Sequence, residues 1–326
     1  MPAMELKLPK SVVERLCAPG NPSETLQIID GRLQSGDGSG AVTFPIIDGT
    51  PILINEDRSI FRIEDFCKGH VTTVDLRSTE KRVDTPAKKL KFLVNRITPA
   101  RSRAVHDFTP HDAMSRIFEE VPDATVLVIG AGDVRYKAAQ RGNIVYTDVA
   151  LAPDTHLIAD AQDIPFVDDT FDAVLAIAVL EHVADPFRTV EEIRRVLKPG
   201  GLVYAITPFM QQVHLGRFDF TRFTALGHRR LFNWFDEIRT GVVNGPGMVV
   251  TWSVEYLLSS FSETPLIHRA LRTASRFIAW PFLLLDGFLA RKAGAYDCAS
   301  AYYFFGRLRA TPIHDREIVA QYRGMH

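Results

Sequence analysis

The chain has 326 residues, 46% of them hydrophobic and 24% charged, and a formal net charge of −1. This composition is typical of a globular protein with room for one large domain and a smaller one. The near-neutral charge excludes a general electrostatic attraction to nucleic acid or to anionic membranes. Three scattered cysteines provide neither a disulfide framework nor a metal quartet, and the N-terminus lacks a signal-peptide core. We therefore expect a cytoplasmic protein without a metal centre.

Residues 1–57 are predicted to form a small β-rich unit, with short strands at residues 26–29 and 41–44 around a glycine-rich turn. Residues 44–54 resemble the end of the zinc-ribbon-like domain related to the activator subunit of tRNA methyltransferases. The cysteine pairs that hold zinc in that family are missing here, so the resemblance implies the fold without its metal. A plain β-hairpin appendage is the alternative interpretation.

Residues 58–120 are polar, and we interpret them as a linker with helices that cover the following domain. These helices are predicted at residues 88–97 and 113–120. Basic clusters in this segment are interspersed with acids, which indicates solvated faces rather than a nucleic-acid site.

A strong local pattern begins at residue 126. Four apolar residues, 126–129, run into the tetrapeptide Gly-Ala-Gly-Asp at 130–133, and a helix is predicted from residue 134. Strand, glycine turn and helix open a nucleotide-binding α/β unit, because glycines let the backbone approach a ligand closely. Val134 stands where the third glycine of the pattern would be, so the motif alone fits an ordinary strand–helix turn equally well.

Strands and helices alternate regularly after this motif. Further strands are predicted at residues 143–148, 156–160, 171–178, 202–207, 236–243 and 300–308. Helices are predicted at residues 186–197, 249–261 and 266–289, and the first of these should end at the turn 198–201. Such alternation predicts an α/β fold with a doubly wound, largely parallel sheet.

Short motifs follow one another along these elements in a fixed order. They are Gly130-x-Gly132, Asp148, residues 159–166, 169–172, 180–183 and 195–201. Each motif is common, but the ordered set over residues 121–210 resembles class I S-adenosylmethionine-dependent methyltransferases. The resemblance implies that residues 121–326 form the family's Rossmann-like, seven-stranded sheet, with a helical insertion at about 248–292. It also implies S-adenosylmethionine as the cofactor.

The resemblance places a cofactor site at the carboxyl ends of the strands, where open α/β sheets bind ligands. Asp148 would accept hydrogen bonds from the ribose diol, and Asp160 would stand where adenine is read. The alternatives are a solvated turn acid for Asp148 and a helix N-cap for Asp160. The implied cofactor residues are Gly130, Ala131, Gly132, Asp133, Asp148, Val149, Asp160, Ala161, Gln162, Ala178 and Val179.

Two residues depart from the family's pattern. Val128 replaces an acid of the first strand that helps to hold the methionine amino group, and Val134 replaces the third glycine. The amino-group contact must then come from elsewhere, and Asp133 is the candidate substitute. These departures also leave a non-catalytic binding protein as a hypothesis.

Residues 214–224 resemble methyltransferases of cell-surface polysaccharide and glycolipid assembly. His214 and Asp219 would then lie on the acceptor side of the cofactor, and Phe209 would contact the substrate. A hydroxyl is a poor nucleophile until its proton leaves, and a histidine titrates in the right range to remove it. We predict His214 as this base, with Asp219 as its orienter.

Two further residues have open roles. His182 is the second choice for the base, with shaping of the pocket as the alternative. Arg222 would bind a sugar hydroxyl, a carboxylate or a phosphate, or it would pair with Asp219.

The predicted reaction is O-methylation of a saccharide or glycolipid hydroxyl. Methylation of a quinone-like small molecule is an alternative, and so is methylation of tRNA or a translation protein, although the neutral charge argues against RNA. The apolar residues 277–285 have basic flanks and fit two arrangements. In one arrangement, residues 277–292 contact the membrane interface as a helix at the inner face of the membrane. In the other, which is favoured, the helix is buried against the sheet.

Overall fold

The computed structural model describes residues 6–36, 41–70, 73, 98–132, 135–136 and 143–325. The helix predicted at residues 88–97 lies outside this part of the chain. Of the helix predicted from residue 134, only Arg135 and Tyr136 are described, and they belong to neither a helix nor a strand.

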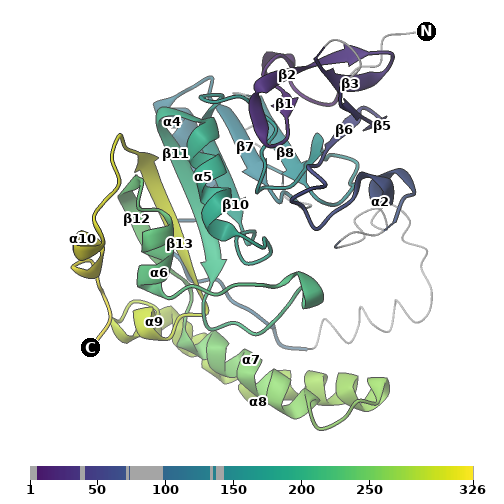
Figure 1. Cartoon of the computed structure of the whole chain (residues 1–326). Coiled ribbons are helices and arrows are strands. Elements are labelled where there is room, and N and C mark those ends of the chain that lie inside the picture. The colour runs from purple at the N-terminus through teal and green to yellow at the C-terminus, as the bar shows by residue number, and fades with distance from the viewer. Residues whose placement is uncertain are drawn as a thin grey trace.

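A mixed sheet forms the body of the molecule, in the strand order β12-β13-β11-β10-β7-β8-β9-β6-β5 (Figure 1). The strands β6 to β11 run parallel to their neighbours, whereas β13 is antiparallel to β11 and β12, and β5 is antiparallel to β6. The strands are β5 (Ile46–Ile47), β6 (Thr50–Leu53), β7 (Thr125–Ile129), β8 (Asn143–Asp148), β9 (Leu157–Ala159), β10 (Phe171–Ile177), β11 (Leu197–Pro208), β12 (Phe235–Asn244) and β13 (Ala301–Leu308). The predicted doubly wound sheet is confirmed: β7 to β13 are the seven predicted strands, and β5 and β6 extend the sheet to nine.

The chain order reverses at the centre of this sheet. It leaves β7 through β8 and β9 on one side and then crosses to β10 on the other side of β7. Such a reversal opens a crevice at the carboxyl ends of the two central strands, where α/β proteins bind ligands. The topology therefore fixes where a site should lie.

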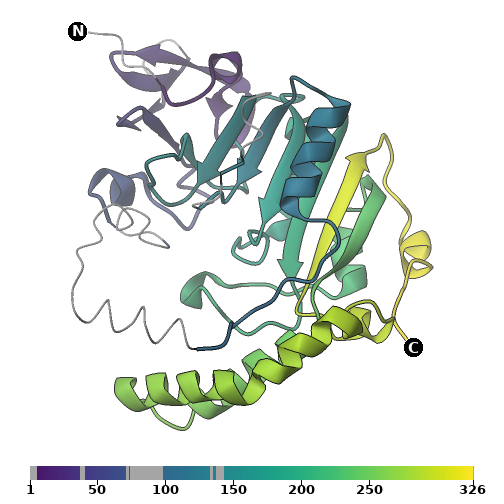
Figure 2. The same ribbon diagram turned by 180° about the vertical axis from the view of Figure 1, so that it is seen from behind.

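Apolar residues of β7 alternate between two helical layers. Val126 and Val128 pack with α4 (Pro110–Glu120), whereas Leu127 and Ile129 pack with α5 (Pro186–Val196) on the other face. Figures 1 and 2 show these helices on opposite faces of the sheet. A strand that is buried on both faces explains the continuous apolar run in the sequence.

A second, smaller sheet forms near the N-terminus, in the order β1-β2-β3-β4. Its elements are α1 (Lys10–Val13), β1 (Cys17–Ala18), β2 (Asn21–Ile29), β3 (Arg32–Ser35) and β4 (Thr43–Phe44). Leu16 and Leu33 share one buried core with Leu53 of β6 and with Phe166. The strand β6 pairs with β9, so the N-terminal region also extends the main sheet.

The remaining helices are α2 (Ile63–Cys67), the 3-10 turn η3 (Gly216–Phe218), α6 (Ala225–Leu231), α7 (Pro246–Ser259), α8 (Pro265–Leu289), α9 (Gly294–Asp297) and α10 (Asp315–Val319). The helices α7 and α8 form an antiparallel hairpin that extends beyond the sheet (Figures 1 and 2). None of the described helices is both long enough and apolar enough to cross a membrane.

Two expectations from the sequence are wrong. The strand β11 begins at Leu197 and includes residues 198–201, which were expected to form a turn, because the register against β10 shifts there. Burial of residues 277–285 against the sheet is also wrong: Phe277, Ile278 and Leu284 are about half exposed. Only one stripe of α8 is buried, namely Ser275, Ala279, Leu283 and Asp286.

Candidate active site

A cavity with a volume of about 250 Å³ opens at the carboxyl ends of β7, β8, β9 and β10. The predicted cofactor residues gather here from four separate strand ends. Those that line the cavity are Gly130, Gly132, Asp148, Val149, Asp160, Ala161, Gln162, Ala178 and Val179. Ala131 is buried beside it, and Asp133 lies outside the described residues, so its role stays a prediction.

The glycine turn after β7 is shaped by its contact with Val179. Gly130 has a φ of +60°, and a Cβ at this position would lie 2.5 Å from Cγ2 of Val179. Gly132 also has a positive φ, but a Cβ there would meet no atom within 4 Å. The first glycine thus lets two strand ends approach each other, and the second leaves an open cradle for a ligand.

Asp148 joins the glycine turn to the end of β8. Its Oδ2 accepts a hydrogen bond from the Gly132 amide at 2.8 Å, and its Oδ1 accepts one from the Ala150 amide at 2.9 Å. Burial raises the pKa of Asp148, and these backbone hydrogen bonds oppose that shift. Each carboxylate oxygen has two acceptor sites, so both oxygens retain capacity for the hydroxyls of a ribose.

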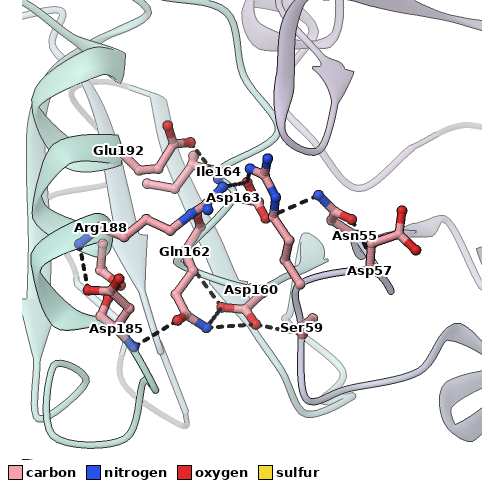
Figure 3. A network of polar contacts seen from close by, with 12 residues as sticks. Asn55, Asp57, Ser59, Asp160, Gln162, Asp163, Ile164, Asp185, Arg188 and Glu192 are labelled. Carbon is pink, nitrogen blue, oxygen red and sulfur yellow. Dashed lines mark hydrogen bonds and ion pairs between the residues drawn. The ribbon is translucent and has the colours of Figure 1, made fainter.

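Asp160 and Gln162 form a buried pair at the end of β9. The Gln162 amide donates to Oδ1 of Asp160 at 3.0 Å, and its side-chain Nε2 donates to the same atom at 3.1 Å. The Gln162 side-chain oxygen accepts from the Asp185 amide at 2.8 Å. This network holds the cavity wall against the start of α5 (Figure 3).

The N-terminal region contributes one wall of the cavity, which we did not predict from the sequence. The Ser59 hydroxyl donates to Oδ2 of Asp160 at 2.6 Å, and the next two residues, Ile60 and Phe61, line the cavity. Asn55 donates to Asp163 at 3.3 Å in the same network (Figure 3). Nothing in the spacing of residues 55–61 indicates these contacts; the position of Ser59 follows only from the pairing of β6 with β9.

Ala178 forms the floor of the cavity in a strained conformation. Its φ is +54°, which is uncommon for a residue with a Cβ, and its amide donates to the Ile206 carbonyl at 3.0 Å. Backbone strain of this kind concentrates at functional sites. The position after β10 that was predicted from the sequence is therefore also conformationally unusual.

Two histidines meet beside the cavity. Nε2 of His182 lies 3.1 Å from Nε2 of His214, and His182 itself lines the cavity. Nδ1 of His182 lies 2.7 Å from the Phe218 carbonyl, which can only accept, so this nitrogen carries the hydrogen. The structure thus brings together the two histidines that the sequence offered as alternative bases.

Asp219 lies behind His214, away from His182. Its Oδ2 lies 3.3 Å from Nδ1 of His214 and accepts the backbone amide of the same residue at 2.9 Å. Although burial opposes it, the hydrogen bonds from Arg222 and from His214 hold the pKa of Asp219 below its usual range. Asp219 is therefore an anion that fixes both the loop and the imidazole.

Glu181 is a third titratable group at this point, and the sequence interpretation gave it no role. Its Oε1 lies 3.7 Å from Nε2 of both His182 and His214, and its Oε2 has no hydrogen-bond partner among the described residues. Burial raises the pKa of Glu181 to about 8. Burial also lowers the pKa of both histidines.

The ligand-type atoms of these three residues lie within 4.8 Å of one another, which is close enough to hold a metal ion. A divalent cation at such a site would favour the carboxylate anion of Glu181. Without a cation, burial favours the protonated form of Glu181. The three residues thus have the ligand atoms for a cation and, without one, form a cluster that can exchange protons.

Two predicted substrate residues are engaged elsewhere. Arg222 binds both oxygens of Asp219 and the backbone carbonyls of Gln211 and Thr221, the latter two at 2.9 and 2.8 Å. This geometry favours the alternative in which Arg222 pairs with Asp219. Phe209 stacks on Tyr302 at 5.8 Å between ring centroids and is not among the residues that line the cavity.

Comparison with known proteins identifies the central part of the chain. Residues 129–205 match the family described as a methyltransferase domain. The match, which covers about a quarter of the chain, supports an S-adenosylmethionine-dependent methyltransferase domain in this region. The match begins at the end of β7 and ends in β11, so it includes all four strand ends of the cavity.

Relatives of the methyltransferase domain match over limited parts of their length. An uncharacterised protein of Methanocaldococcus jannaschii is 28% identical over 46% of this chain and 67% of its own length. A demethylmenaquinone methyltransferase of Symbiobacterium thermophilum is 34% identical over 35% of this chain and 44% of its own length. Two further relatives are matched over only 18% and 20% of their length.

One solved structure that the chain matches weakly is 1,6-didemethyltoxoflavin-N1-methyltransferase of Burkholderia thailandensis, with bound 1,6-didemethyltoxoflavin and S-adenosylhomocysteine. It is 13% identical, the match covers 73% of this chain and 94% of that one, and the TM-score is 0.37.

S-adenosylmethionine is the cofactor of the methyltransferase domain, and the cavity residues fit it. The open cradle at Gly132 suits the amino-acid part, and Asp148 retains acceptor sites for the ribose. Ile60 and Phe61 offer an apolar wall beside Asp160, which suits a heteroaromatic ring. The cavity that fits the cofactor is thus lined both by residues 129–205 and by the segment after β6.

Proposed function

We propose that the chain methylates a hydroxyl group of a saccharide or glycolipid, with S-adenosylmethionine as the methyl donor. The observation that carries this proposal is the contact between His182 and His214, 3.1 Å apart at their Nε2 atoms and next to the cofactor cavity. The bound cofactor supplies a methyl group on a sulfonium. The residues of the chain must then orient the acceptor oxygen and take its proton.

The two imidazoles are suited to take up one proton together. The hydrogen on Nδ1 of His182 leaves the lone pair of its Nε2 directed at His214. A proton that leaves the acceptor oxygen would be shared between the two Nε2 atoms, which lie at hydrogen-bond distance. Asp219 would stabilise the positive charge from the far side of His214.

The protonation state of His182 and His214 also supports their role as a base. Burial is the largest cause that lowers the pKa of each histidine below 6.5, so both are neutral at pH 7. A base must be unprotonated before it acts. Transfer should therefore be fully active at neutral pH and should decline as the pH falls through the lowered pKa values.

A quinone-like acceptor is the second candidate. Relatives named demethylmenaquinone methyltransferase match this chain at 51% identity over 45 residues and at 34% identity over 121 residues. Removal of the proton from a quinol hydroxyl makes both its oxygen and the adjacent ring carbon more nucleophilic, so the same histidine pair would serve as the base. The matches cover only 18% and 44% of these relatives' own length, so they support the acceptor class less directly than the shared methyltransferase activity.

The proposal is tested by transfer of labelled methyl from S-adenosylmethionine to extracted saccharides, glycolipids and quinones. We expect label in the saccharide or glycolipid fraction with the wild-type protein. His214→Ala should reduce the rate by about 100-fold or more, because a positioned base contributes that much. Its affinity for S-adenosylmethionine, measured by calorimetry, should be unchanged.

His314→Ala is the matched control, because His314 is exposed and lies outside the residues that line the cavity. It should keep the wild-type rate. Wild-type turnover in His214→Ala would remove the histidine from the mechanism. Label confined to the quinone fraction would replace the first acceptor with the second.

A further inference from the structure

The helix α8 presents a continuous apolar face to solvent. Nine of its large apolar side chains are between 41% and 75% exposed: Leu266, Ile267, Phe277, Ile278, Trp280, Phe282, Leu284, Leu285 and Phe288. Leu266, Phe277, Leu284 and Phe288 are spaced by 11, 7 and 4 residues, so they follow one line along the helix. Over the 25 residues of α8 this face is roughly 37 Å long. An exposed apolar patch of that size marks an interaction site.

The opposite face of α8 is fixed against α7. Both oxygens of the buried Asp286 accept backbone amides at the start of α7, from Gly247 at 2.7 Å and from Met248 at 2.9 Å. A Cβ on Gly247 would lie 2.0 Å from the Phe282 carbonyl, so the two helices are in close contact. The apolar face is therefore held outward and cannot turn into the hairpin without breaking these contacts.

The charges of the hairpin are predominantly basic. Arg269, Arg291 and Lys292 are exposed near the two ends of α8. The buried Glu255 of α7 is contacted by Arg101, Arg272 and Arg276, so three cations surround one carboxylate. Asp286 is buried, and Glu263 is the exposed acid in the turn between the helices.

From this combination we infer that the apolar face of α8 binds the surface of an anionic lipid membrane. A helix with an apolar face, a tryptophan and basic flanks lies in the headgroup region, where the rings and aliphatic side chains enter the lipid and the cations meet phosphates. The helix is long enough to cross a bilayer but not apolar enough, so it would lie on the membrane. In a symmetric pair of copies, the same basic residues would face one another, so charge complementarity favours lipid.

The hairpin also contacts the loop that carries His214, through side chains of α7. The hydroxyl of Tyr256 in α7 donates to the Val213 carbonyl, and Gln212 donates to Ser253 of α7 at 3.0 Å. This loop exposes three apolar side chains of its own, at Met210, Val213 and Phe220. The helix α7 thus connects the loop of the histidine pair with the helix that would bind lipid. Binding to lipid does not depend on which acceptor is methylated.

The inference is tested by sedimentation of the full chain with vesicles. One set contains phosphatidylglycerol and phosphatidylcholine, and the other contains phosphatidylcholine alone. We expect the wild-type protein to sediment with the anionic vesicles, to shift its tryptophan emission to the blue, and to bind less as salt is raised. The double variant Ile278→Glu/Leu285→Glu should bind at least 10-fold more weakly.

Ile28→Glu is the matched control, since Ile28 is an apolar residue of similar exposure on β2, far along the chain from the hairpin. It should bind vesicles as the wild type does. Circular dichroism and S-adenosylmethionine binding verify that each variant is folded. A wild-type protein that stays in solution with anionic vesicles would overturn the inference. A dimer in light scattering that Ile278→Glu/Leu285→Glu converts to a monomer, without vesicle binding, would assign the face to a second copy instead.

Discussion

His228 is enclosed in an aromatic environment between α6 and β13. Its ring lies edge-on to Phe232 and Phe304, with centroids 5.3 and 6.4 Å away, and no described residue offers a hydrogen bond to its Nε2. Burial lowers the pKa of His228 from 6.5 to about 3 and that of His156 to about 4. Both histidines are therefore neutral in the folded protein across the physiological range.

This burial predicts a specific dependence of stability on pH. Below pH 6.5 the unfolded chain takes up protons that the folded chain excludes, so the free energy of unfolding falls as the pH falls. Each such histidine contributes a loss of about 1.4 kcal/mol per pH unit until its folded pKa is reached. His228→Leu should therefore reduce the slope of unfolding free energy between pH 6.5 and 4, measured by denaturant titration at several pH values.

The control for this measurement is His111→Leu, because His111 is exposed on α4. The pH slope of that variant should match the wild-type slope. The account of His228 fails if His228→Leu retains the full wild-type slope, whatever its absolute stability.

The sequence predicts the position of a single residue well where that residue ends a strand. Asp148 and Asp160 end adjacent strands, and parallel strands bring their carboxyl ends to one edge, so both could be placed at the cavity in advance. Ser59 and Phe61 could not, because their position depends on β6 pairing with β9 about 100 residues away. Glu181 was named only as part of a common motif, and its buried environment appears only in three dimensions.

Besides Asp286, a second buried carboxylate stabilises the hairpin of α7 and α8. Glu255 lies 3.0 Å from Nε of Arg101, 2.6 Å from Nε of Arg272 and 3.7 Å from Nε of Arg276. Glu255→Gln removes the anion and leaves three guanidinium groups facing one another. We expect a loss of about 1.5–3 kcal/mol of unfolding free energy, as for hydrogen bonds to charged groups. Denaturant unfolding and the rate of proteolysis within the hairpin measure it.

Glu263→Gln is the matched change in the exposed turn between the same helices. It should alter stability by less than about 0.5 kcal/mol, because exposed substitutions away from such networks are nearly neutral. Equal effects of the two variants would show that the arginine cluster does not hold the hairpin together.

At the level of elements, the local sequence pattern predicts whether a helix or strand forms better than it predicts what that element packs against. The apolar spacing placed two helices at 249–261 and 266–289, close to the observed α7 and α8. It did not show that α8 would bury only a narrow stripe against α7, because the partner of a helix face is decided by tertiary packing. The start of β11 was also misplaced, since proline and glycine at 199–201 suggest a turn, whereas pairing with β10 accommodates them as a bulge.

For the whole molecule, the strand order explains why residues from four strands and from the N-terminal region meet in one cavity. The sheet reverses between β7 and β10, and β6 extends it beyond β9, so the segment after β6 arrives at the same edge as Asp160. The alternation of strands and helices was enough to predict the reversal. The addition of β6 was not predictable, because a four-residue apolar strand carries no information about which edge it will join.

The central claim is that this edge binds S-adenosylmethionine and that Asp148 holds it. Calorimetry of the wild-type chain, Asp148→Asn and Asp123→Asn with S-adenosylmethionine tests it directly. Asp123 is an exposed acid and serves as the control. We predict saturable binding by the wild type and by Asp123→Asn, and at least tenfold weaker binding by Asp148→Asn, which corresponds to about 1.4 kcal/mol or more. Equal binding by all three proteins, or no binding by the wild type at millimolar cofactor, would contradict the account.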